Sequence, residues 1–264
     1  MDNERRAWYR RMLADKVREA AYKEALRRYA PGRTVVDVGA GYGHLSLWAL
    51  EAGARRVIAI EQDRDAIAQW AQTLGPHMAN VTCVNALSFD ADVGPVGDIV
   101  VAEVFDACGV GEGALDTLKD ARRFLRPGGI MIPSAMSMHV CLLDEPLPSP
   151  PGKLAYIDIA DGAGEWYRWS PNEETGIHVQ REDAYHGFGL AFTAQLAPGL
   201  ALTNLPGHPP THWRQGAMSF GEPIDLLEGQ ILIVRGRVDG TRDRLNPNVE
   251  FALLNVELAA SAAG

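Results

Sequence analysis

The sequence predicts an α/β protein in which a doubly wound parallel sheet is followed by an antiparallel β domain. First, short apolar runs alternate with amphipathic stretches, which is typical of parallel strands joined by helices. Second, a glycine-rich loop comes directly after the first of these runs. Third, the alternation stops at Pro133, after which short strand-like segments lie between proline and glycine clusters. The predicted parallel strands are residues 35–38, 57–60, 81–84, 99–102 and 130–132.

The amino-terminal part is predicted to form one helix over residues 4–29, because it is rich in Ala, Arg, Glu and Leu and ends before a Pro-Gly pair. Asp15, Arg18 and Tyr22 recur at steps of three and four along this helix, so they share one face. By themselves they are typical of a solvated polar stripe. Further helices are predicted near residues 64–74 and 113–125, and a turn at 126–129 leads into the fifth strand.

Two domains are predicted, one over residues 1–133 and one over residues 134–264. The second has short segments of alternating polarity and lacks helical periodicity, which favours an antiparallel sandwich or barrel. The proline-rich stretch at 143–152 is predicted to be a surface loop. The strand candidates of this domain are residues 137–143, 188–196, 230–238 and 249–258.

Composition restricts the classes of function. No apolar run approaches the roughly 20 residues that cross a bilayer, and the charged amino terminus does not resemble a signal peptide, so we expect a cytoplasmic protein without membrane contact. The formal charge of −9 disfavours a nucleic-acid partner. Cys83, Cys108 and Cys141 stand alone in the sequence, so neither a disulfide framework nor a metal site is predicted.

The glycine loop predicts a nucleotide-type cofactor. Gly39, Gly41 and Gly43 lie between the first strand and a helix, where small residues permit close approach of a ligand and the helix start offers unpaired N–H groups. Glu61 ends the second strand, a position from which an acid accepts hydrogen bonds from ribose hydroxyls. Asn85 follows the third strand and is a candidate for contact with the adenine.

The spacing of the glycines distinguishes two cofactor classes. A dinucleotide loop needs G-x-G-x-x-G, whereas this loop reads G-x-G-x-G and has His44 where the third glycine would fall. This form resembles the first motif of S-adenosylmethionine-dependent methyltransferases and implies their Rossmann-like sheet. S-adenosyl-L-methionine is therefore the expected cofactor.

Two acids follow the fourth strand. Glu103 and Glu112 are nine positions apart, on a loop that contains glycine. An arbitrary pair of this kind is often only surface charge. A guanidinium, however, is planar, carries five N–H donors and stays protonated, so two carboxylates are suited to bind it and leave one nitrogen facing a methyl group.

At this point the chain resembles the protein arginine methyltransferases, which place the target guanidinium between two loop glutamates with this separation. Residues 12–18 with Tyr22 resemble the family's amino-terminal helix motif, 211–215 its Thr-His-Trp loop, and 126–135 its domain junction. The resemblance covers most of residues 9–258. It implies that Arg18 binds the cofactor's carboxylate and that His212 pairs with Asp15.

The resulting site predictions are as follows. The catalytic residues are Glu103, Glu112, His212 and Asp15. The cofactor-binding residues are Arg18, Asp37, Gly39, Gly41, Gly43, Glu61 and Asn85. The substrate-binding residues are Glu103, Glu112, Trp213 and Met12, and no residue is assigned to a metal.

The chain departs from the family pattern in three places. Residues 104–111, between the two glutamates, read Val-Phe-Asp-Ala-Cys-Gly-Val-Gly, closer to the subgroup that stops at monomethylarginine than to dimethylating members. The family's lid segment has no room before Trp8. The β half is short, so the dimerisation arm is expected to be reduced, although a homodimer stays open. These departures favour free arginine or a small guanidino metabolite as acceptor, with Arg214, Arg168 and His178 as candidates for its carboxylate and amine.

Three alternatives stay open from sequence. The acceptor is an arginine within a protein or peptide, or it is another amine or an oxygen, or the chain is a cofactor-bound interaction module without catalysis. Paired carboxylates disfavour a neutral acceptor, which gains nothing from them. The proton released on transfer has two candidate acceptors, Glu112 and the Asp15–His212 pair.

Overall fold

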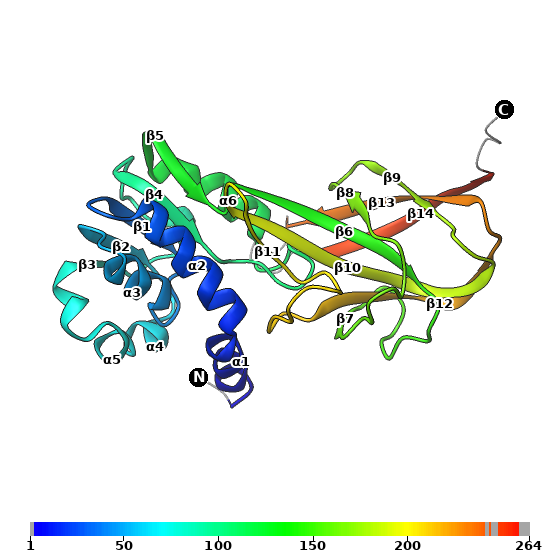
Figure 1. Cartoon of the computed structure of the whole chain (residues 1–264), viewed down its shortest axis with the longest axis horizontal. Helices are drawn as coiled ribbons and strands as arrows, with labels where there is room; N and C mark the ends of the chain where they lie inside the picture. Colours follow the sequence, from blue (N-terminus) through cyan, green and yellow to red (C-terminus); the bar gives the residue numbers. More distant parts are fainter. Residues whose placement is uncertain (1–2, 241–242, 244–247, 259–264) are drawn as a thin grey trace. The chain divides into compact units, whose positions relative to one another are not determined.

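A computed structural model of the chain describes residues 3–240, 243 and 248–258. All five predicted parallel strands are present, as β1 (Thr34–Val38), β2 (Arg56–Ile60), β3 (Val81–Val84), β4 (Gly97–Ala102) and β5 (Leu125–Ile132). They form one sheet in the order β3-β2-β1-β4-β5 (Figure 1). The chain moves outward from β1 through β2 to β3 and then continues at β4 on the other side of β1. This reversal places a ligand crevice at the carboxyl ends of β1 and β4.

Helices connect these strands. The helix α3 (His44–Glu51) packs on β1 and β2 and contacts the preceding helix α2 (Lys16–Tyr29). The single helix predicted at 64–74 is instead two short helices, and the last residues of the one predicted at 113–125 form a 3-10 turn. The other elements of this region are α4 (Arg64–Ile67), α5 (Trp70–Leu74), η1 (Gly75–Asn80), η2 (Ser88–Asp90), α6 (Ala114–Ala121) and η3 (Arg122–Phe124).

The prediction of one helix over residues 4–29 was wrong. The chain forms α1 (Asn3–Ala14) and then α2, with Asp15 between them in an extended conformation. The Asp15 carboxylate accepts a hydrogen bond of 2.9 Å from the backbone N–H of Arg18. Asp15 thereby satisfies one of the unpaired N–H groups at the start of α2, as an N-cap residue does.

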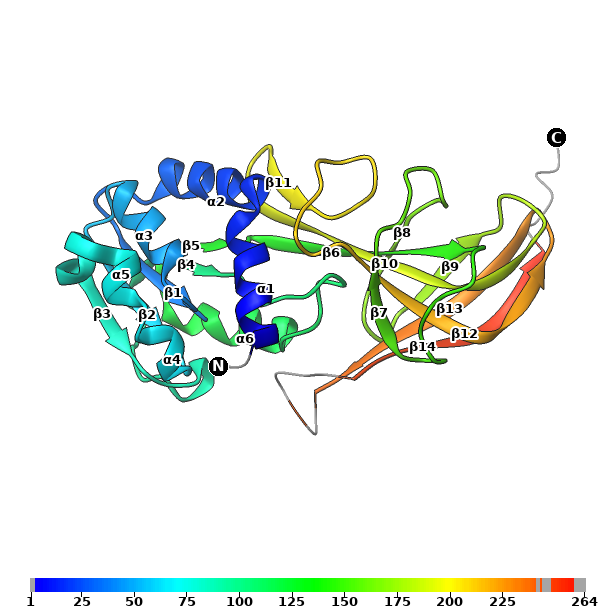
Figure 2. The same ribbon diagram turned by 90° about the horizontal axis from the view of Figure 1, so that it is seen from below.

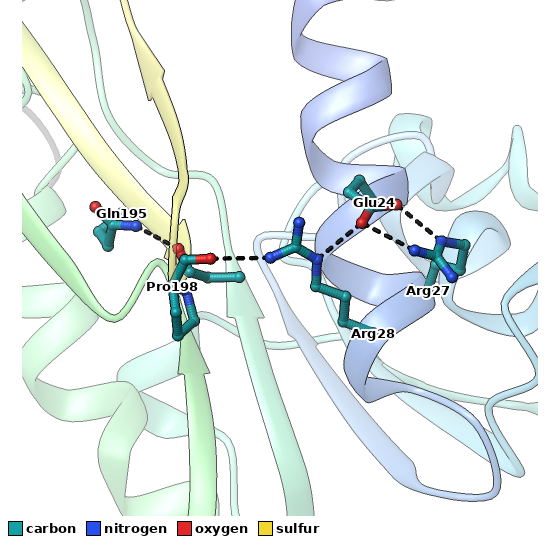
Figure 3. A network of polar contacts seen from close by, with 6 residues as sticks. Glu24, Arg27, Arg28, Gln195 and Pro198 are labelled. Atoms are coloured by element: carbon teal, nitrogen blue, oxygen red, sulfur yellow. Dashed lines mark hydrogen bonds and ion pairs between the residues drawn. The ribbon is translucent and has the colours of Figure 1, made fainter.

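The carboxyl-terminal end of α2 is tied to a segment distant in sequence. Arg28 lies between Glu24, one turn earlier in α2, and the carbonyl of Pro198, to which its Nη1 donates at 2.9 Å (Figure 3). The Gln195 side chain donates to the Leu200 carbonyl at 3.1 Å and holds this tight turn closed. The turn joins β10 (Asp183–Ala197) to β11 (Leu200–Thr203).

The second half of the chain is antiparallel β structure, as predicted (Figures 1 and 2). A six-stranded sheet has the order β7-β12-β10-β6-β8, with β11 paired to β10, and a three-stranded sheet has the order β14-β13-β9. The four predicted strands lie within β6, β10, β13 and β14. The strands not introduced above are β6 (Ala135–Leu143), β7 (Leu154–Ile157), β8 (Tyr167–Trp169), β9 (Glu174–His178), β12 (Gln215–Leu226), β13 (Gln230–Asp239) and β14 (Asn248–Leu258).

The turn predicted at 126–129 is part of strand β5. Gly97 pairs with Leu125 and Ile99 with Ile130, so the extra residues form a bulge opposite Asp98. Arg126 makes an ion pair with Asp98, whose carboxylate also accepts a hydrogen bond of 2.8 Å from Thr34 N–H in β1. The bulge therefore replaces ladder hydrogen bonds with a buried carboxylate that joins the adjacent strands.

The chain divides into two compact units that are interleaved in sequence. The first comprises residues 1–104, 114–136 and 194–202, and the second comprises 105–113, 137–193 and 203–264. The first has a core of aliphatic side chains on β1, β2 and β4, and a core cluster of the second includes Cys141 and Ile159. The predicted boundary after residue 133 stays a prediction, because compactness alone does not give one cut. Within the described residues, no helix has both the length and the apolar character to cross a membrane.

Candidate active site

The glycine loop has the backbone geometry that its sequence predicts. Gly39, Gly41 and Gly43 have φ values of +71°, +52° and +84°, in the left-handed region that side chains disfavour. A Cβ on Gly39 would lie 2.6 Å from Cγ1 of Val104. Gly43 is the N-cap residue of α3. The loop therefore turns sharply at the carboxyl end of β1 and directs the start of α3 toward the crevice.

Aromatic side chains that the sequence analysis missed surround this loop. Tyr9 of α1 is 9% exposed and stacks on Tyr42 with ring centroids 4.0 Å apart. Its hydroxyl lies 3.4 Å from the position of a Cβ on Gly41. On the other side, Trp70 Nε1 donates to the Gly41 carbonyl at 2.8 Å. No local pattern identifies Tyr9 or Trp70, because each meets the loop across a long stretch of sequence.

Glu61 binds the glycine loop directly. Its carboxylate accepts a hydrogen bond of 2.7 Å from Gly41 N–H and another of 2.7 Å from Asp63 N–H, one on each oxygen. A carboxylate oxygen has two lone pairs, so each retains capacity for a ribose hydroxyl. The Asn85 side chain is exposed and donates to the Glu61 carbonyl at 3.0 Å, and its oxygen accepts from Arg64 at 3.0 Å. Asn85 thus orders the loop after β2, and its contact with the adenine stays a prediction.

Asp37 is fully buried beneath the glycine loop. Its carboxylate accepts a hydrogen bond of 2.6 Å from the Ser46 hydroxyl in α3. Burial raises the pKa of Asp37 to about 7; the bond from Ser46 opposes this shift, and the charges of Glu61 and Glu103 add to it. Asp37 fastens β1 to α3, and its predicted contact with the cofactor stays a prediction.

Arg18 and Glu103 form a buried ion pair. Arg18 Nε donates to Glu103 Oε1 at 2.5 Å, and the two side chains are only 4% and 6% exposed. The Trp48 ring lies 5.4 Å and the Tyr22 ring 5.9 Å from the guanidinium carbon. Burial lowers the pKa of Arg18, but the charge and hydrogen bond of Glu103 more than offset this, so the pKa is raised. Arg18 is therefore a fixed cation at the end of β4.

The surroundings of Arg18 fit a cofactor carboxylate. Its Nη1 is buried and has no hydrogen-bond partner among the residues that the structure describes. A buried guanidinium nitrogen without an acceptor is costly, and the carboxylate of S-adenosylmethionine would supply one. The charge of Glu103 also acts on Tyr22, whose fully buried hydroxyl has a pKa raised by burial first and by Glu103 second.

The loop of residues 105–113 is built around Asp106, which the sequence analysis also missed. One oxygen of Asp106 accepts hydrogen bonds from the backbone N–H groups of Cys108, Val110 and Gly111, at 3.0, 3.3 and 2.9 Å. A Cβ on Gly111 would lie 2.4 Å from that carboxylate. The glycine is needed at this position so that the backbone can close over Asp106.

This loop is fastened within the second unit. Trp213 Nε1 donates to the Phe105 carbonyl at 3.0 Å, and the two rings stack with centroids 5.4 Å apart. The Asn204 side chain donates to the Ala107 carbonyl at 2.7 Å. Trp213 is 7% exposed, so the structure gives it an anchoring contact, and its predicted contact with substrate stays a prediction.

Glu112 sits at the end of this loop in a strained conformation. Its φ is +57°, which non-glycine residues rarely adopt and which is often retained at functional sites. Its side chain is exposed, and its charge, with that of Asp106, helps raise the pKa of Tyr156, a shift that arises mainly from burial. Glu112 belongs to the second unit and Glu103 to the first.

The remaining predicted residues lie at the ends of elements. Met12 is 8% exposed in the last turn of α1, and Asp15 caps α2. The centroids of the His212 and Trp213 rings are 4.0 Å apart. The pairing of Asp15 with His212 stays a prediction. No group of three or more potential metal-binding side chains occurs in the part of the chain that the structure describes.

Comparison with known proteins agrees with this geometry. The family described as "Methyltransferase domain" matches residues 35–129. Two curated relatives are an arginine N(omega)-methyltransferase of Streptomyces achromogenes subsp. streptozoticus, 29% identical over 86% of this chain and 75% of the relative, and protein arginine N-methyltransferase 1 of Dictyostelium discoideum, 26% identical over 84% and 78%.

Solved structures share the fold. The Trypanosoma brucei PRMT1 enzyme–prozyme heterotetrameric complex with AdoHcy has a TM-score of 0.76 at 19% identity, over 94% of this chain and 93% of that one. Arabidopsis thaliana protein arginine methyltransferase 10 has a TM-score of 0.77 at 20% identity, over 96% and 93%.

The fold and the glycine loop define a class I methyltransferase, an enzyme class whose methyl donor is S-adenosylmethionine. Within that class, the chain is similar to protein arginine methyltransferases in its Rossmann-like sheet and in the antiparallel β structure that follows. Both expectations from sequence, the cofactor and the family resemblance, are confirmed.

Proposed function

We propose that this enzyme transfers a methyl group from S-adenosylmethionine to a guanidinium nitrogen of arginine, and that the acceptor is free L-arginine or a similarly small guanidino compound. The observation that carries the proposal is the buried ion pair of Arg18 and Glu103. The carboxylate at the end of β4 already binds one guanidinium at 2.5 Å in surroundings that exclude water. A second guanidinium, that of the substrate, suits its other oxygen.

The roles of the residues follow from this pair. Arg18 holds the cofactor's carboxylate through Nη1 while Nε keeps Glu103 in place. Glu61 accepts from the ribose hydroxyls. Glu103 and Glu112 bind two nitrogens of the acceptor guanidinium and leave the third in line with the methyl carbon. When bound, S-adenosylmethionine would supply the methyl group, and the electron pair of the broken C–S bond would stay on its sulfur.

The proton is lost during or after transfer. A free guanidinium stays protonated at any ordinary pH, so removal of its proton before methyl transfer would be costly. As the new N–C bond forms, the nitrogen's proton becomes acidic and passes to Glu112 or to the Asp15–His212 pair. Mono- or dimethylation is decided by the space left around this nitrogen, and we expect monomethylarginine.

Two observations favour a small acceptor over a peptide. The Streptomyces relative carries the name of an arginine methyltransferase and matches 86% of this chain. In addition, the β half is short, which is why we expect the family's dimerisation arm to be reduced. The other curated relatives are named as protein arginine methyltransferases, which keeps a peptide acceptor as the second candidate. Three further expectations also stay predictions. They are the cytoplasmic location, the lack of a nucleic-acid or membrane partner, and the possibility of a homodimer.

Competition decides between the acceptors. The experiment measures kcat/KM for free arginine and for an arginine inside a capped peptide, with labelled cofactor and product identification. We expect free arginine to win. A peptide preference of about tenfold or more, worth roughly 1.4 kcal/mol in transition-state binding, would replace the small-molecule proposal with the peptide one. Turnover of neither would leave the chain as an interaction module or a methyltransferase of another acceptor.

A further inference from the structure

The second unit contains a cavity that the proposed chemistry at the guanidinium does not use. Its volume is about 290 Å³, and it is lined by Asp158, Ile159 and Asp161 and by residues 204–211 together with Arg214 and Gln215. The Gln215 side chain joins the two walls, because its oxygen accepts from Ile159 N–H at 2.9 Å and its nitrogen donates to the Asn204 carbonyl. Hydrogen bonds of Gln215 thus join the backbone segments that bound the cavity, and three prolines are among the lining residues.

The cavity is built on the same framework as the loop that ends at Glu112. The Asn204 side chain is 3% exposed and donates to the Ala107 carbonyl of that loop at 2.7 Å and to the Arg214 carbonyl at 2.6 Å. Cys108 of that loop lies against Gly216, the residue after Gln215 of the cavity wall, where an added Cβ would lie 2.4 Å from the Cys108 sulfur. One end of the cavity wall therefore lies beside the loop of residues 105–113 within this unit.

The cavity carries both signs of charge. Arg214 has φ +55°, a strained conformation, and its Nε and Nη2 bind the two Asp158 oxygens at 3.0 and 2.9 Å. Two of its five donors are used, so others are left for a carboxylate. The Asp158 side chain is 80% exposed, so Arg214 can give up this ion pair for a substrate carboxylate at little cost in free energy. Asp161 is the second acid, and it lies against the backbone of Gly207.

We propose that this cavity binds the α-amino and α-carboxylate groups of a free amino-acid substrate, with Arg214 as the partner of the carboxylate and the carboxylates of Asp158 and Asp161 as partners of the ammonium. The proposal rests on the proposed function and gives it an amino-acid specificity. The Thr211 hydroxyl, which is buried and has no hydrogen-bond partner among the described residues, is available to the same carboxylate. Of the three cationic candidates from sequence, only Arg214 lines the cavity; Arg168 lies on β8, and His178 stacks on Tyr167.

The test compares three guanidino substrates: arginine, agmatine, which lacks the α-carboxylate, and 5-guanidinopentanoate, which lacks the α-amine. For Arg214→Gln we expect KM for arginine and for 5-guanidinopentanoate to rise by about tenfold or more, as for loss of a charge-assisted pair, with kcat and the KM for agmatine little changed. For Asp161→Asn we expect the arginine and agmatine KM to rise and that of 5-guanidinopentanoate to stay. Arg237→Gln, at an exposed arginine on β13 of the same unit, is the matched control and should change none of them.

The outcomes separate the two proposals. If none of the three compounds is methylated, the proposed acceptor class is wrong. If they are methylated but Arg214→Gln weakens all three equally, Arg214 only supports its strained loop and the cavity assignment is wrong. If the variants change turnover of a basic peptide and leave free arginine alone, the cavity binds peptide flanks, which also overturns the assignment. Arg214→Lys, with its melting temperature measured, keeps the charge and distinguishes a folding defect from lost recognition.

Discussion

The two glutamates of the proposed clamp differ in what holds them. Glu103 is buried against Arg18, whereas Glu112 is exposed on a strained loop. Removal of the charge at position 103 leaves the Arg18 cation without its partner inside the protein. The side chain of Glu112 is exposed, so removal of its charge should disturb the protein interior less. The same substitution at the two positions should therefore have different physical consequences.

Glu103→Gln is expected to lower the free energy of unfolding by about 3–5 kcal/mol, the cost of breaking a buried pair on one side, and to abolish turnover. Glu112→Gln should abolish turnover with stability within about 0.5 kcal/mol of the parent, as for surface changes. Urea unfolding and methylation assays on both variants check this. Near-normal turnover in Glu112→Gln would remove it from the clamp, and unchanged stability in Glu103→Gln would mean that the pair with Arg18 contributes little.

Asp37 predicts a pH dependence. The pKa of Asp37 is about 7 in the folded chain and 3.8 for an ordinary aspartate, as in the unfolded chain. At pH values between these two, the unfolded chain has released a proton that the folded chain keeps. Its contribution to stability is fully present below pH 3.8 and is lost as pH rises to about 7. The difference is at most roughly 4 kcal/mol. Asp37→Asn should remove this component, so the stability of the variant falls less between pH 4.5 and 7, as measured by urea unfolding. Parallel profiles would show that Asp37 is ionised when folded.

At the scale of elements, the loop of residues 105–113 depends on one carboxylate. Asp106→Ala removes the acceptor of three backbone N–H groups, and we expect kcat/KM to fall about tenfold or more while cofactor affinity stays within about twofold, since each such bond contributes roughly 1.5–3 kcal/mol. Asp106→Asn, which keeps one acceptor oxygen, should recover part of the loss. Asp116→Ala, an exposed acid on α6, is the control. An Asp106→Ala enzyme with parental kinetics would show that the loop keeps its shape without this carboxylate.

The sequence predicted those elements whose signals are local. Five parallel strands and the glycine loop follow from apolar runs and glycine spacing, and Glu61 follows from its place after β2. The break at Asp15 was not predicted, because the residues on both sides of this N-cap favour a helix and the composition shows no interruption. Tyr9, Trp70 and Asp106 escaped prediction because their contacts join residues through the fold. β12 was missed because Gln215–Leu226 contains glycine and proline within an otherwise paired strand.

At the scale of the whole molecule, the two compact units share their chain in both directions. Residues 105–113 leave the first unit for the second, and residues 194–202 return from the second to the first. Each of these two segments is flanked in sequence by residues of the other unit. Loss of structure in one unit therefore releases both ends of a segment that belongs to the other. We infer that the units unfold together.

S-adenosylmethionine at about 100 times its Kd should then stabilise the whole chain by about 2.7 kcal/mol in a single transition, seen alike by far-UV circular dichroism and tryptophan fluorescence. Arg18→Ala should abolish the shift, and NAD should give none. Two separated transitions, only one of which responds to the ligand, would refute joint unfolding. A shift with NAD would contradict the cofactor assignment.

The Arg18–Glu103 pair also has a bearing on how the protein is handled. A carboxylate that prefers guanidinium groups does not distinguish a substrate from a denaturant cation of the same shape. Dilute guanidinium chloride is therefore expected to inhibit turnover well below any concentration that unfolds the chain, whereas neutral urea is not. Arginine added to refolding or storage buffers would act as a ligand, and a preparation kept in it would enter each assay already loaded.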